Sequence, residues 1–509
     1  MAWKERLDRW EAGLARAGAA LERPGPYLWA SAGLVLVAIL VRLPLVARAT
    51  DVCCGHPDSW VYFHQAYAEY LRGNLFPDGH RGSGWQLLLF ATLKLFGFAP
   101  ATGWNAYGAP MTGEAARAAL VAHTLSAMLS VGAVAATLLL AREVLSRPAA
   151  LLAGALVALD PYLLRLSTSA LSEPLYVPLF VLATMTVLRA RKHPAWLLAT
   201  GTLMAFAHMM KVNGLVMFVM LMAFAAILLW HGSWRSLRAN RRTAMWMAAS
   251  GIAFLLVASP YLAWRGSQLS SPFDYGTNQR FWADDLWDLN DAWWSAYTPE
   301  HGAPRETLSD YASHHTWRDA ATRLWQSVEW QAFDLFGSGR WPAQESEGGA
   351  WVGTAPEESA LTPLVFALAL VACLTLTRQR AWWFLPLAVG ATFATFVWIY
   401  PLVRSVRYFA PLLPLFSVAA VAGWLRLATL VERPRLVGTA IFGAYFVLYA
   451  GVPLLHAGEG VAMLAQPEVR ILVGIVGALW MLVALAPGLD ALLRRAREWT
   501  PASKREAAP

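Results

Sequence analysis

A short stretch around residue 58 carries side chains that acid–base chemistry at a membrane surface would need. Asp58 and His56 lie in GHPDSWVYFHQAYAEY, directly after the first strongly apolar segment. A carboxylate at the start of a helix on the outer membrane surface can act as a general base for an acceptor hydroxyl. Asp is also a favoured N-cap residue, so capping of the helix that follows is an alternative role for Asp58.

An amphipathic helix is predicted from Trp60 onward, and it would position Asp58 at its start. The apolar side chains that share one face are spaced by three and four residues: Phe63, Ala66, Tyr67 and Tyr70. The element that carries the candidate base is therefore expected to pack against the protein rather than to lie free in solvent.

The composition excludes an ordinary soluble protein. The chain has 509 residues, of which 57% are hydrophobic and 15% charged. Long apolar runs recur along it, so we expect an all-α polytopic membrane protein with membrane lipid as its surroundings. The formal net charge of +8 does not indicate a nucleic-acid partner, because most Lys and Arg residues fall in short clusters between apolar segments.

About twelve transmembrane helices are predicted from the apolar runs. The expected spans are 27–47, 115–141, 148–166, 173–189, 195–210, 213–231, 243–263, 360–377, 381–400, 408–425, 436–455 and 467–488. With these spans, the basic clusters fall in alternate loops, which places both termini in the cytoplasm. The apolar run 85–98 is too short to span comfortably, and we expect it to lie on the outer surface or to dip into it.

Two large outer loops follow from this topology. The chain is expected to begin with a cytoplasmic amphipathic helix at 1–26, which precedes an N-terminal transmembrane module at 27–263. The first outer loop, 48–114, lies within that module, and a Trp-rich extracytoplasmic loop follows it at 264–359. A C-terminal transmembrane module at 360–488 and a cytoplasmic tail at 489–509 complete the expected organisation. The tryptophans of the second loop, Trp317, Trp325 and Trp330 among them, would suit stacking on sugar rings. An interfacial aromatic belt explains them equally well.

Basic residues on the outer side are exceptions to this charge pattern. Lys211, Arg404 and Arg407 lie at the outer ends of spans, and Arg81 lies in the first outer loop. Arginine binds two phosphate oxygens at once through its planar fork, and lysine adds a compact positive charge. If these residues converge, they would form a site for a lipid phosphate or pyrophosphate. Snorkelling to the outer headgroups is the alternative for each of them taken alone.

Glu173 opens an expected span in RLSTSALSEPLYVPLF and is followed by Pro174, which suits the first helical turn. A glutamate there complements the helix dipole, which is a sufficient structural reason for it. Reaching an acceptor or a metal ion is the functional alternative.

Several short motifs together resemble the GT-C glycosyltransferases, with the protein O-mannosyltransferases and lipid A aminoarabinose transferases as the nearest groups. The motifs are DSWVY at 58–62, LRGNLFPDG, LLLFATLKLFG, STSALSEPLY around Glu173, and the pair Arg407-Tyr408 followed by PLLP. The family pattern has a second acid where this chain has Ser59, and its Lys-Pro-Pro stretch is replaced by His80-Arg81-Gly82-Ser83.

The resemblance implies a polyprenyl-phosphate-linked sugar as donor and an inverting transfer on the extracytoplasmic side, in the plasma membrane of a bacterium. Asp58 would be the general base or the carboxylate that orients the acceptor. The residues implied for the donor phosphate are Arg81, Lys211, Arg404, Arg407 and Tyr408. Those implied for the acceptor region are His56, Tyr62, His80 and Glu173.

The resemblance leaves the metal and the acceptor open. Ser59 in place of the acid means that a metal ligand is not carried over, so a divalent metal stays an open question as a cofactor. Cys53 and Cys54 have no His or Cys partners at ligand spacing, which favours packing roles for them. The acceptor would be a glycan, a lipid or a protein hydroxyl.

Two other functions are alternatives for a membrane protein of this kind. An enzyme like an oligosaccharyltransferase should carry a large soluble C-terminal domain with a Trp-Trp-Asp motif, but Trp294 is followed here by Ser295. A transporter or flippase for a lipid-linked glycan would fit about twelve spans. However, the two halves show no obvious internal repeat, and the polar residues gather at the outer ends of spans.

Overall fold

The computed structural model describes residues 2–48, 57–77, 81–100, 112–230, 237–269, 272, 308–336, 361–376, 378–400, 405–455 and 457–498. The described residues form helices and contain no strand. The helices up to residue 268 are α1 (Ala2–Leu21), α2 (Pro24–Arg48), α3 (Pro57–His64), α4 (Gly84–Leu95), α5 (Gly113–Ala141), α6 (Arg147–Ala158), α7 (Pro161–Ser167), α8 (Glu173–Arg189), α9 (Trp196–Met210), α10 (Gly214–Leu229) and α11 (Leu237–Gln268). Those that follow are α14 (Leu308–His314), α15 (Trp317–Phe336), α16 (Pro363–Leu376), α17 (Phe384–Phe396), α18 (Leu413–Leu427), α19 (Pro434–Leu455), α20 (Ala457–Met463) and α21 (Pro467–Glu498). Shorter pieces are the π-helix η1 (Gln65–Glu69) and the 3-10 helices η2 (Tyr70–Arg72), η4 (Arg380–Trp383), η5 (Val406–Leu412) and η6 (Ala428–Leu430).

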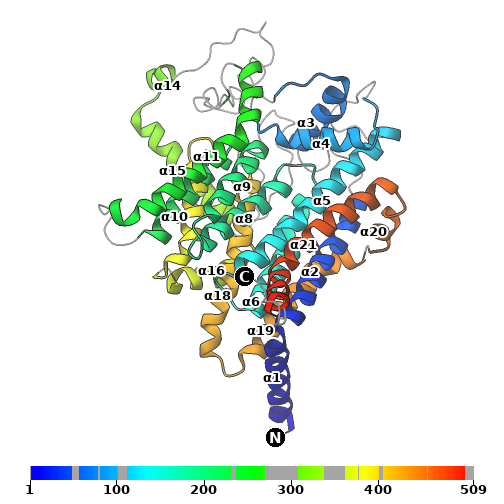
Figure 1. The fold of residues 1–509 in the computed structure, drawn as a ribbon, viewed down its shortest axis with the longest axis vertical. Helices are drawn as coiled ribbons and strands as arrows, with labels where there is room; N and C mark the ends of the chain where they lie inside the picture. The colour runs from blue at the N-terminus through cyan, green and yellow to red at the C-terminus, as the bar shows by residue number, and fades with distance from the viewer. Residues whose placement is uncertain are drawn as a thin grey trace, which may run out of the picture.

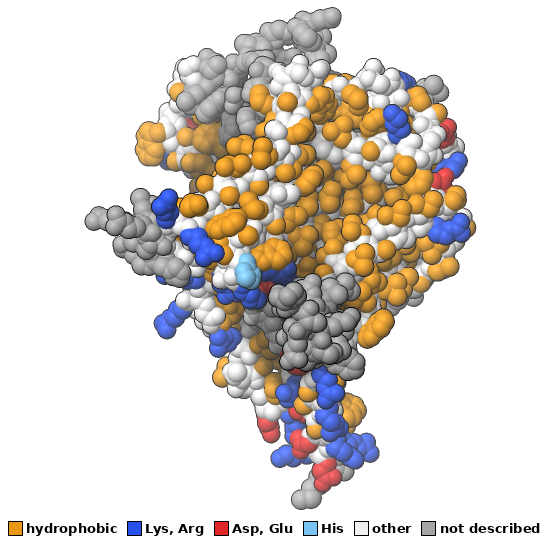
Figure 2. Space-filling model, in the orientation of Figure 1, with side chains coloured by type: hydrophobic (Ala, Val, Ile, Leu, Met, Phe, Trp, Pro, Cys, Tyr) orange, Lys and Arg blue, Asp and Glu red, His pale blue; other side chains and the backbone are white. Residues whose placement is uncertain are grey.

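Five helical segments among the described residues are long and apolar enough to cross a membrane. They are Pro24–Arg48, Gly113–Ala141, Asn240–Gln268, Val406–Leu430 and Pro467–Ala486. The pair α6 and α7 would make a sixth span, and shorter apolar helices occur at Trp196–Met210, Gly214–Leu229, Pro363–Leu376 and Pro434–Ala450. Hydrophobic side chains cover the middle of the face drawn in Figure 2, while Lys and Arg gather along its lower border and on α1. The protein is thus an all-α integral membrane protein.

Helix α5 forms the centre of the bundle. Its most apolar stretch is buried throughout, and α2, α6, α8 and α21 pack around it. Figure 1 shows α5 running beside α21 and α2. Small residues allow this packing: a Cβ atom on Gly132 would lie 2.3 Å from the ring of Trp480. Burial on all sides is what an apolar helix without a polar face requires.

One expected span is broken. The sequence indicated a continuous span at 148–166, but α6 and α7 are bent by 56° at the intervening residues. Asp160 is the N-cap of α7 and its Oδ1 accepts the N–H of Leu163 at 2.8 Å, with Pro161 in the first turn. Aspartate before proline is a strong start signal for a new helix, and it overrides the continuous apolar pattern here.

Two other helices are longer than their expected spans. Helix α11 continues past residue 263 to Gln268, so residues expected to begin the second outer loop are helical. Helix α21 continues past residue 488 to Glu498, into the expected tail. Helices commonly extend beyond the apolar stretch, because polar helix formers continue the backbone hydrogen bonds outside it.

Helix α1 projects from the bundle, at the opposite end from α3 and α4 (Figure 1). Its carboxylates meet the start of α19: Asp8 pairs with Arg433 at 3.0 Å and Glu11 with Arg435 at 3.3 Å. The predicted position of this helix on the cytoplasmic membrane surface stays a prediction.

The amphipathic helix expected after Trp60 is confirmed, in a modified form. Helix α3 passes directly into η1 and then η2, so the chain is helical from Pro57 to Arg72 with a π-helical turn inside it. The four side chains predicted to share the apolar face are all buried: Phe63, Ala66, Tyr67 and Tyr70. This packing fixes the start of α3, and with it Asp58.

Candidate active site

Five charged side chains from distant parts of the chain form one continuous cluster, which we call the charge cluster. Asp58 Oδ1 lies 2.6 Å from Arg81 Nη2, and Asp58 Oδ2 is paired with Arg407 Nη2. Arg407 Nε lies 3.8 Å from Glu173 Oε1, which also accepts a hydrogen bond from Lys211 Nζ. The order of contacts is therefore Arg81, Asp58, Arg407, Glu173 and Lys211. Several of the positions indicated by sequence thus meet in space.

Each member comes from the end of a helix. Asp58 is in the first turn of α3, Glu173 is the first residue of α8, and Lys211 is the C-cap of α9. Arg81 precedes α4, and Arg407 lies in η5 at the start of the span that α18 continues. Helix ends leave backbone groups unpaired within the helix, which makes them natural positions for polar sites.

Two glycines allow the Arg81 segment to lie directly on the end of α9. A Cβ atom on Gly82 would be 2.5 Å from the backbone oxygen of Met209, and one on Gly84 would be 2.7 Å from the side chain of Met210. A larger residue at position 82 would push this segment away from the backbone that leads to Lys211. Close backbone approach is the reason for glycine here.

The segment before Glu173 is also held by hydrogen bonds. Trp85 Nε1 donates to the carbonyl oxygen of Ala170 at 2.8 Å, and Ser126 Oγ of α5 donates to the carbonyl oxygen of Ser169 at 2.5 Å. Both contacts satisfy backbone acceptors in a non-helical stretch inside the protein, as buried carbonyls require. These contacts fix the position of Glu173, a member of the charge cluster that is only 1% exposed.

Aromatic rings surround the cations. Arg81 Cζ lies 5.9 Å from the ring centre of Tyr62, and Lys211 Nζ lies 5.2 Å from that of Tyr408 and 6.0 Å from that of Tyr176. These separations fall within the range of cation–π attraction. Tyr62 and Tyr408, both indicated from the sequence, are therefore at the site.

The cluster carries three positive and two negative side chains, which leaves one net positive charge. Burial lowers the pKa of Lys211, while the neighbouring Glu173 carboxylate acts in the opposite direction. Burial raises the pKa of Tyr62, and the nearby Asp58 carboxylate adds to this effect. Tyr62 therefore keeps its proton and can act as a hydrogen-bond donor.

Some buried polar groups at or next to the cluster residues have no hydrogen-bond partner among the described residues. The described residues contain such groups throughout the bundle, and those close in sequence to the cluster are Ser59 Oγ, Tyr176 Oη, the side-chain amide of Asn213, Ser405 Oγ and Arg407 Nε. Each belongs to a cluster residue or lies within three positions of one. Buried polar groups are normally satisfied, so these atoms are available to a polar ligand or to water at the site.

Helix capping by itself does not explain the two ion pairs of Asp58. Helix α3 begins at Pro57, so Asp58 lies inside its first turn, and both of its carboxylate oxygens face guanidinium groups. Three of the indicated residues, His56, His80 and Arg404, lie outside the described residues. Across the part of the chain that the structure describes, no group of three or more His, Cys, Asp or Glu side chains could hold a metal ion.

Few tryptophans of the second outer loop fall in the described region. Trp317 is 83% exposed and Trp325 is 70% exposed, whereas Trp330 packs against the core. Trp264, in the last turns of α11, is half-buried, and the other loop tryptophans lie outside the described residues. The hypothesis of sugar stacking by this loop stays a prediction.

Sequence reasoning missed Arg265 and Tyr261, which contact the Arg81 segment from α11. A signal was present, because Arg265 is a basic residue at the outer end of an expected span, like Lys211. The expected span ends at residue 263, so Arg265 falls in the expected outer loop and does not stand out as a span-end cation.

Comparison with known protein families gives one match. Residues 36–265 match the sequence model of the family described as dolichyl-phosphate-mannose-protein mannosyltransferase. The matched region contains four members of the charge cluster, Asp58, Arg81, Glu173 and Lys211, and ends before Arg407. The match confirms the resemblance to the protein O-mannosyltransferase group.

Solved structures with a similar arrangement of helices include two kinds of glycosyltransferase. One is the archaeal oligosaccharyltransferase AglB from Archaeoglobus fulgidus in complex with an inhibitory peptide and a dolichol-phosphate, with 16% identity and a TM-score of 0.46, covering 89% of this chain and 56% of that one. The other is ArnT from Cupriavidus metallidurans bound to undecaprenyl phosphate, with 16% identity and a TM-score of 0.46, covering 92% of this chain and 80% of that one. The chain thus spans little more than half the length of the archaeal enzyme. No curated protein matches it.

Proposed function

We propose that this protein is an inverting GT-C glycosyltransferase that moves a sugar from a polyprenyl-phosphate donor to an extracytoplasmic acceptor. The observation that carries the proposal is the position of Asp58 between the guanidinium groups of Arg81 and Arg407, with Lys211 beside them. A base next to an anion site is what displacement of a phosphate from an anomeric carbon needs.

The donor phosphate would bind to Arg81, Lys211 and Arg407. The net positive charge of the cluster favours an anion, and Arg407 Nε is a buried donor without a hydrogen-bond partner among the described residues. Guanidinium groups bind phosphate oxygens through two parallel N–H bonds. We place Tyr408 and Arg404 in the same phosphate site, Tyr408 because its ring lies 5.2 Å from Lys211 Nζ.

Asp58 would change partners when the donor binds. Without a ligand, its carboxylate neutralises Arg81 and Arg407; a phosphate that accepts hydrogen bonds from the same guanidinium groups replaces it. Asp58 can then accept the proton of the acceptor hydroxyl. The acceptor oxygen forms the new bond to the anomeric carbon, and the bond from that carbon to the phosphate oxygen breaks. Polyprenyl phosphate leaves, and the single displacement inverts the configuration.

The acceptor side of the site would be formed by Tyr62 together with His56 and His80. Tyr62 keeps its proton and lies beside Arg81, so its hydroxyl can donate to a sugar or acceptor oxygen. Glu173, whose carboxylate contacts Lys211 and Arg407, positions these two cations. The acceptor hydroxyl would belong to a glycan, a lipid or a protein.

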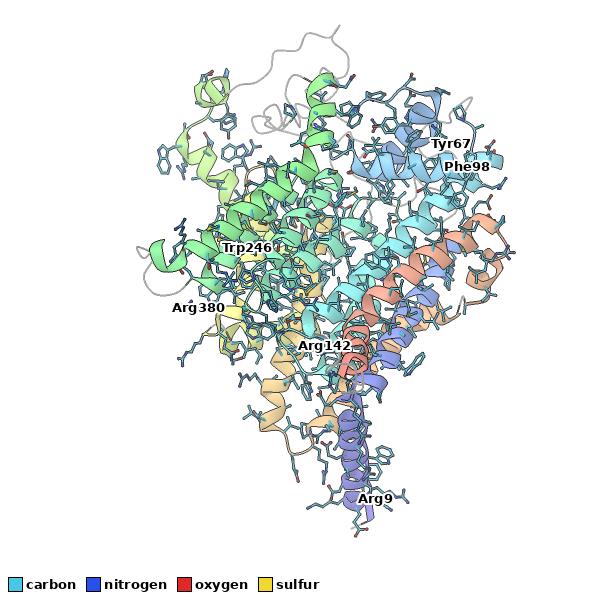
Figure 3. The ribbon with its side chains drawn as sticks, viewed as in Figure 1. Arg9, Tyr67, Phe98, Arg142, Trp246 and Arg380 are labelled. Carbon is cyan, nitrogen blue, oxygen red and sulfur yellow. The ribbon has the colours of Figure 1, made fainter. Side chains whose placement is uncertain are left out.

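The topology we propose has about twelve spans and two large outer loops, 48–114 and 264–359, with the domain boundaries expected from the sequence. Each expected span falls on a described helix or on the bent pair α6 and α7. Figure 3 supports the orientation: Tyr67 and Phe98, from the first expected outer loop, lie near one end of the bundle. Arg142 and Arg380, from expected cytoplasmic loops, lie toward the end from which α1 projects. We propose a bacterial plasma membrane with both termini in the cytoplasm.

Release of polyprenyl phosphate from a short-chain polyprenyl-phosphate sugar tests the function. Purified wild-type protein should release it in the presence of acceptor, and Asp58→Asn should bind the donor without releasing it. Binding without release by either protein, followed by lipid movement across vesicles, would instead establish a flippase. Absence of donor binding by wild-type protein would refute the proposal.

A comparison of Arg407→Lys with Arg407→Ala tests the anion site separately. The lysine variant keeps the charge and loses the two-pronged contact, so it should bind polyprenyl phosphate better than the alanine variant and less well than wild type. Equal affinity of all three proteins would place the phosphate elsewhere.

A further inference from the structure

Arg265 is a fully buried arginine whose described contacts reach two backbone segments. Its Nη1 donates to the carbonyl oxygen of Arg81 at 3.2 Å, and its Nε donates to the carbonyl oxygen of Pro272 at 3.3 Å. Arg265 lies in the last turn of α11, while Pro272 belongs to the outer segment that follows this helix. One side chain thus joins the beginning of the second outer loop to the residue that contacts Asp58.

Tyr261 adds a second contact from the same helix. Its hydroxyl oxygen accepts the backbone N–H of Ser83 at 3.0 Å, and it lies 3.5 Å from Arg265 Nη1. The backbone at 81 and 83 is therefore bound by α11, while Gly82 rests against the end of α9. The Arg81 segment is fixed between two helices, and its side chain extends from there to Asp58.

We propose that Arg265 is a positioning residue that couples the outer segment after α11 to the guanidinium of Arg81. The inference deepens the proposed function, since it rests on Arg81 as a ligand of the donor phosphate. A displacement of the backbone at Pro272 reaches Arg81 through Arg265. Donor affinity consequently depends on the position of the backbone at Pro272.

The chemistry of arginine suits this role. A planar guanidinium presents N–H groups in several fixed directions, so it can bridge carbonyl oxygens of two separate segments. The ammonium of lysine is a compact group on a flexible stem and cannot reproduce both contacts. A buried guanidinium is also costly unless it is hydrogen-bonded, so the contacts are tied to the fold of this region.

A double-mutant cycle on the purified full-length protein tests the coupling. Arg265→Gln should weaken binding of a short-chain polyprenyl phosphate by about tenfold, as expected for residues in contact. In an Arg81→Ala background the same substitution should have almost no further effect, because Arg265 acts through Arg81. Equal losses in both backgrounds would refute the proposal, since a general effect on folding would be additive.

Arg380→Lys is the matched control. Arg380 also donates to a backbone carbonyl, that of Trp230 at 2.8 Å, but it belongs to η4 and is not a member of the charge cluster. Arg265→Lys should weaken polyprenyl phosphate binding, and Arg380→Lys should leave it unchanged. A similar loss in both variants would overturn the assignment.

Hydrogen exchange gives a readout that does not depend on any ligand. Backbone amides at 81–86 should exchange faster in Arg265→Gln and in Tyr261→Phe than in wild type, and no faster in Arg380→Lys. Unchanged exchange in both variants would refute the coupling. If wild-type protein bound no polyprenyl phosphate, the proposed function would fail, while the exchange result would still decide the role of Arg265.

Discussion

The carboxylate of Asp58, in α3, is paired with the guanidinium of Arg407, in η5, so the first outer segment is joined directly to the start of a span near the other end of the chain. Arg81 binds the second oxygen of the same carboxylate. In this arrangement both arginines are neutralised by the protein itself. An incoming phosphate competes with Asp58 for them, which links donor binding to release of the base.

This competition predicts opposite effects of Asp58→Asn on binding and on turnover. The amide no longer attracts the arginines, so the donor should bind at least as tightly as in wild type. Transfer should fall by about 10²–10⁴-fold, the usual contribution of a general base. Calorimetric binding and single-turnover release measure the two quantities. Glu459→Gln, which alters an exposed carboxylate, is the control. Donor affinity that fell together with turnover would contradict the model of competition.

The pair formed by Glu173 and Lys211 predicts a stability effect. Glu173→Gln leaves a buried cation without its carboxylate, and such losses amount to about 3–5 kcal/mol. The double variant Glu173→Gln/Lys211→Met should regain much of this stability, because the uncompensated charge is removed with its partner. Thermal unfolding in detergent compares wild type, Glu173→Gln, Lys211→Met and the double variant. A loss in the double variant equal to the sum of the two single losses would show that the two side chains do not act as a pair.

The pH dependence of donor binding should depend on Lys211. Burial lowers the pKa of this ammonium, so it loses its proton at a lower pH than an exposed lysine does. Protonated Lys211 attracts the phosphate; affinity is therefore complete below this pKa and falls as the pH rises through it. The phosphate itself is fully ionised above about pH 6–7 and adds no change in the alkaline range. Titrated binding of polyprenyl phosphate should show the alkaline loss in wild type and not in Lys211→Arg. The same loss in both would assign it to another group.

Gly82→Ala should weaken donor binding without unfolding the protein. The added methyl group would lie 2.5 Å from a backbone oxygen of α9, so the Arg81 segment must shift, at a cost of about 1–3 kcal/mol. Gly33→Ala, where a Cβ meets no atom within 4 Å, is the matched control. Affinity for polyprenyl phosphate should fall only in the first variant. Unchanged affinity would mean that the Arg81 segment is not needed in its present position.

The parts of the fold and site that were predictable are those that local sequence encodes. The spacing of Phe63, Ala66, Tyr67 and Tyr70 predicted a buried helical face, and these side chains are buried. Basic residues on the outer side predicted that cations would converge, and Arg81, Lys211 and Arg407 do so. Exposed apolar surface is costly, so apolar residues recur at the spacing of one helix face. A charge at membrane depth is also costly, so an isolated basic residue there indicates a partner or a site.

What escaped prediction depends on contacts that residue types do not encode. The pairing of Asp58 with two arginines joins three distant segments, and no local pattern specifies partners over such separations. Arg265 donates to backbone carbonyl oxygens, and every residue has one, so residue types do not indicate its partners. The bend at Asp160 was predictable in principle, because Asp-Pro starts helices, but the continuous apolar run concealed it.

The burial of α5 has a consequence for how the enzyme should respond to its bilayer. Since the most apolar stretch of this helix is covered by protein on all sides, acyl chains do not contact it. Hydrophobic mismatch acts through the lipid-facing helices, which tilt to match the local thickness. The segment before Glu173 is held by α5, because Ser126 of this helix donates a hydrogen bond to the carbonyl oxygen of Ser169. Changes in acyl-chain length should therefore alter the tilt of the peripheral helices more than the geometry around Glu173.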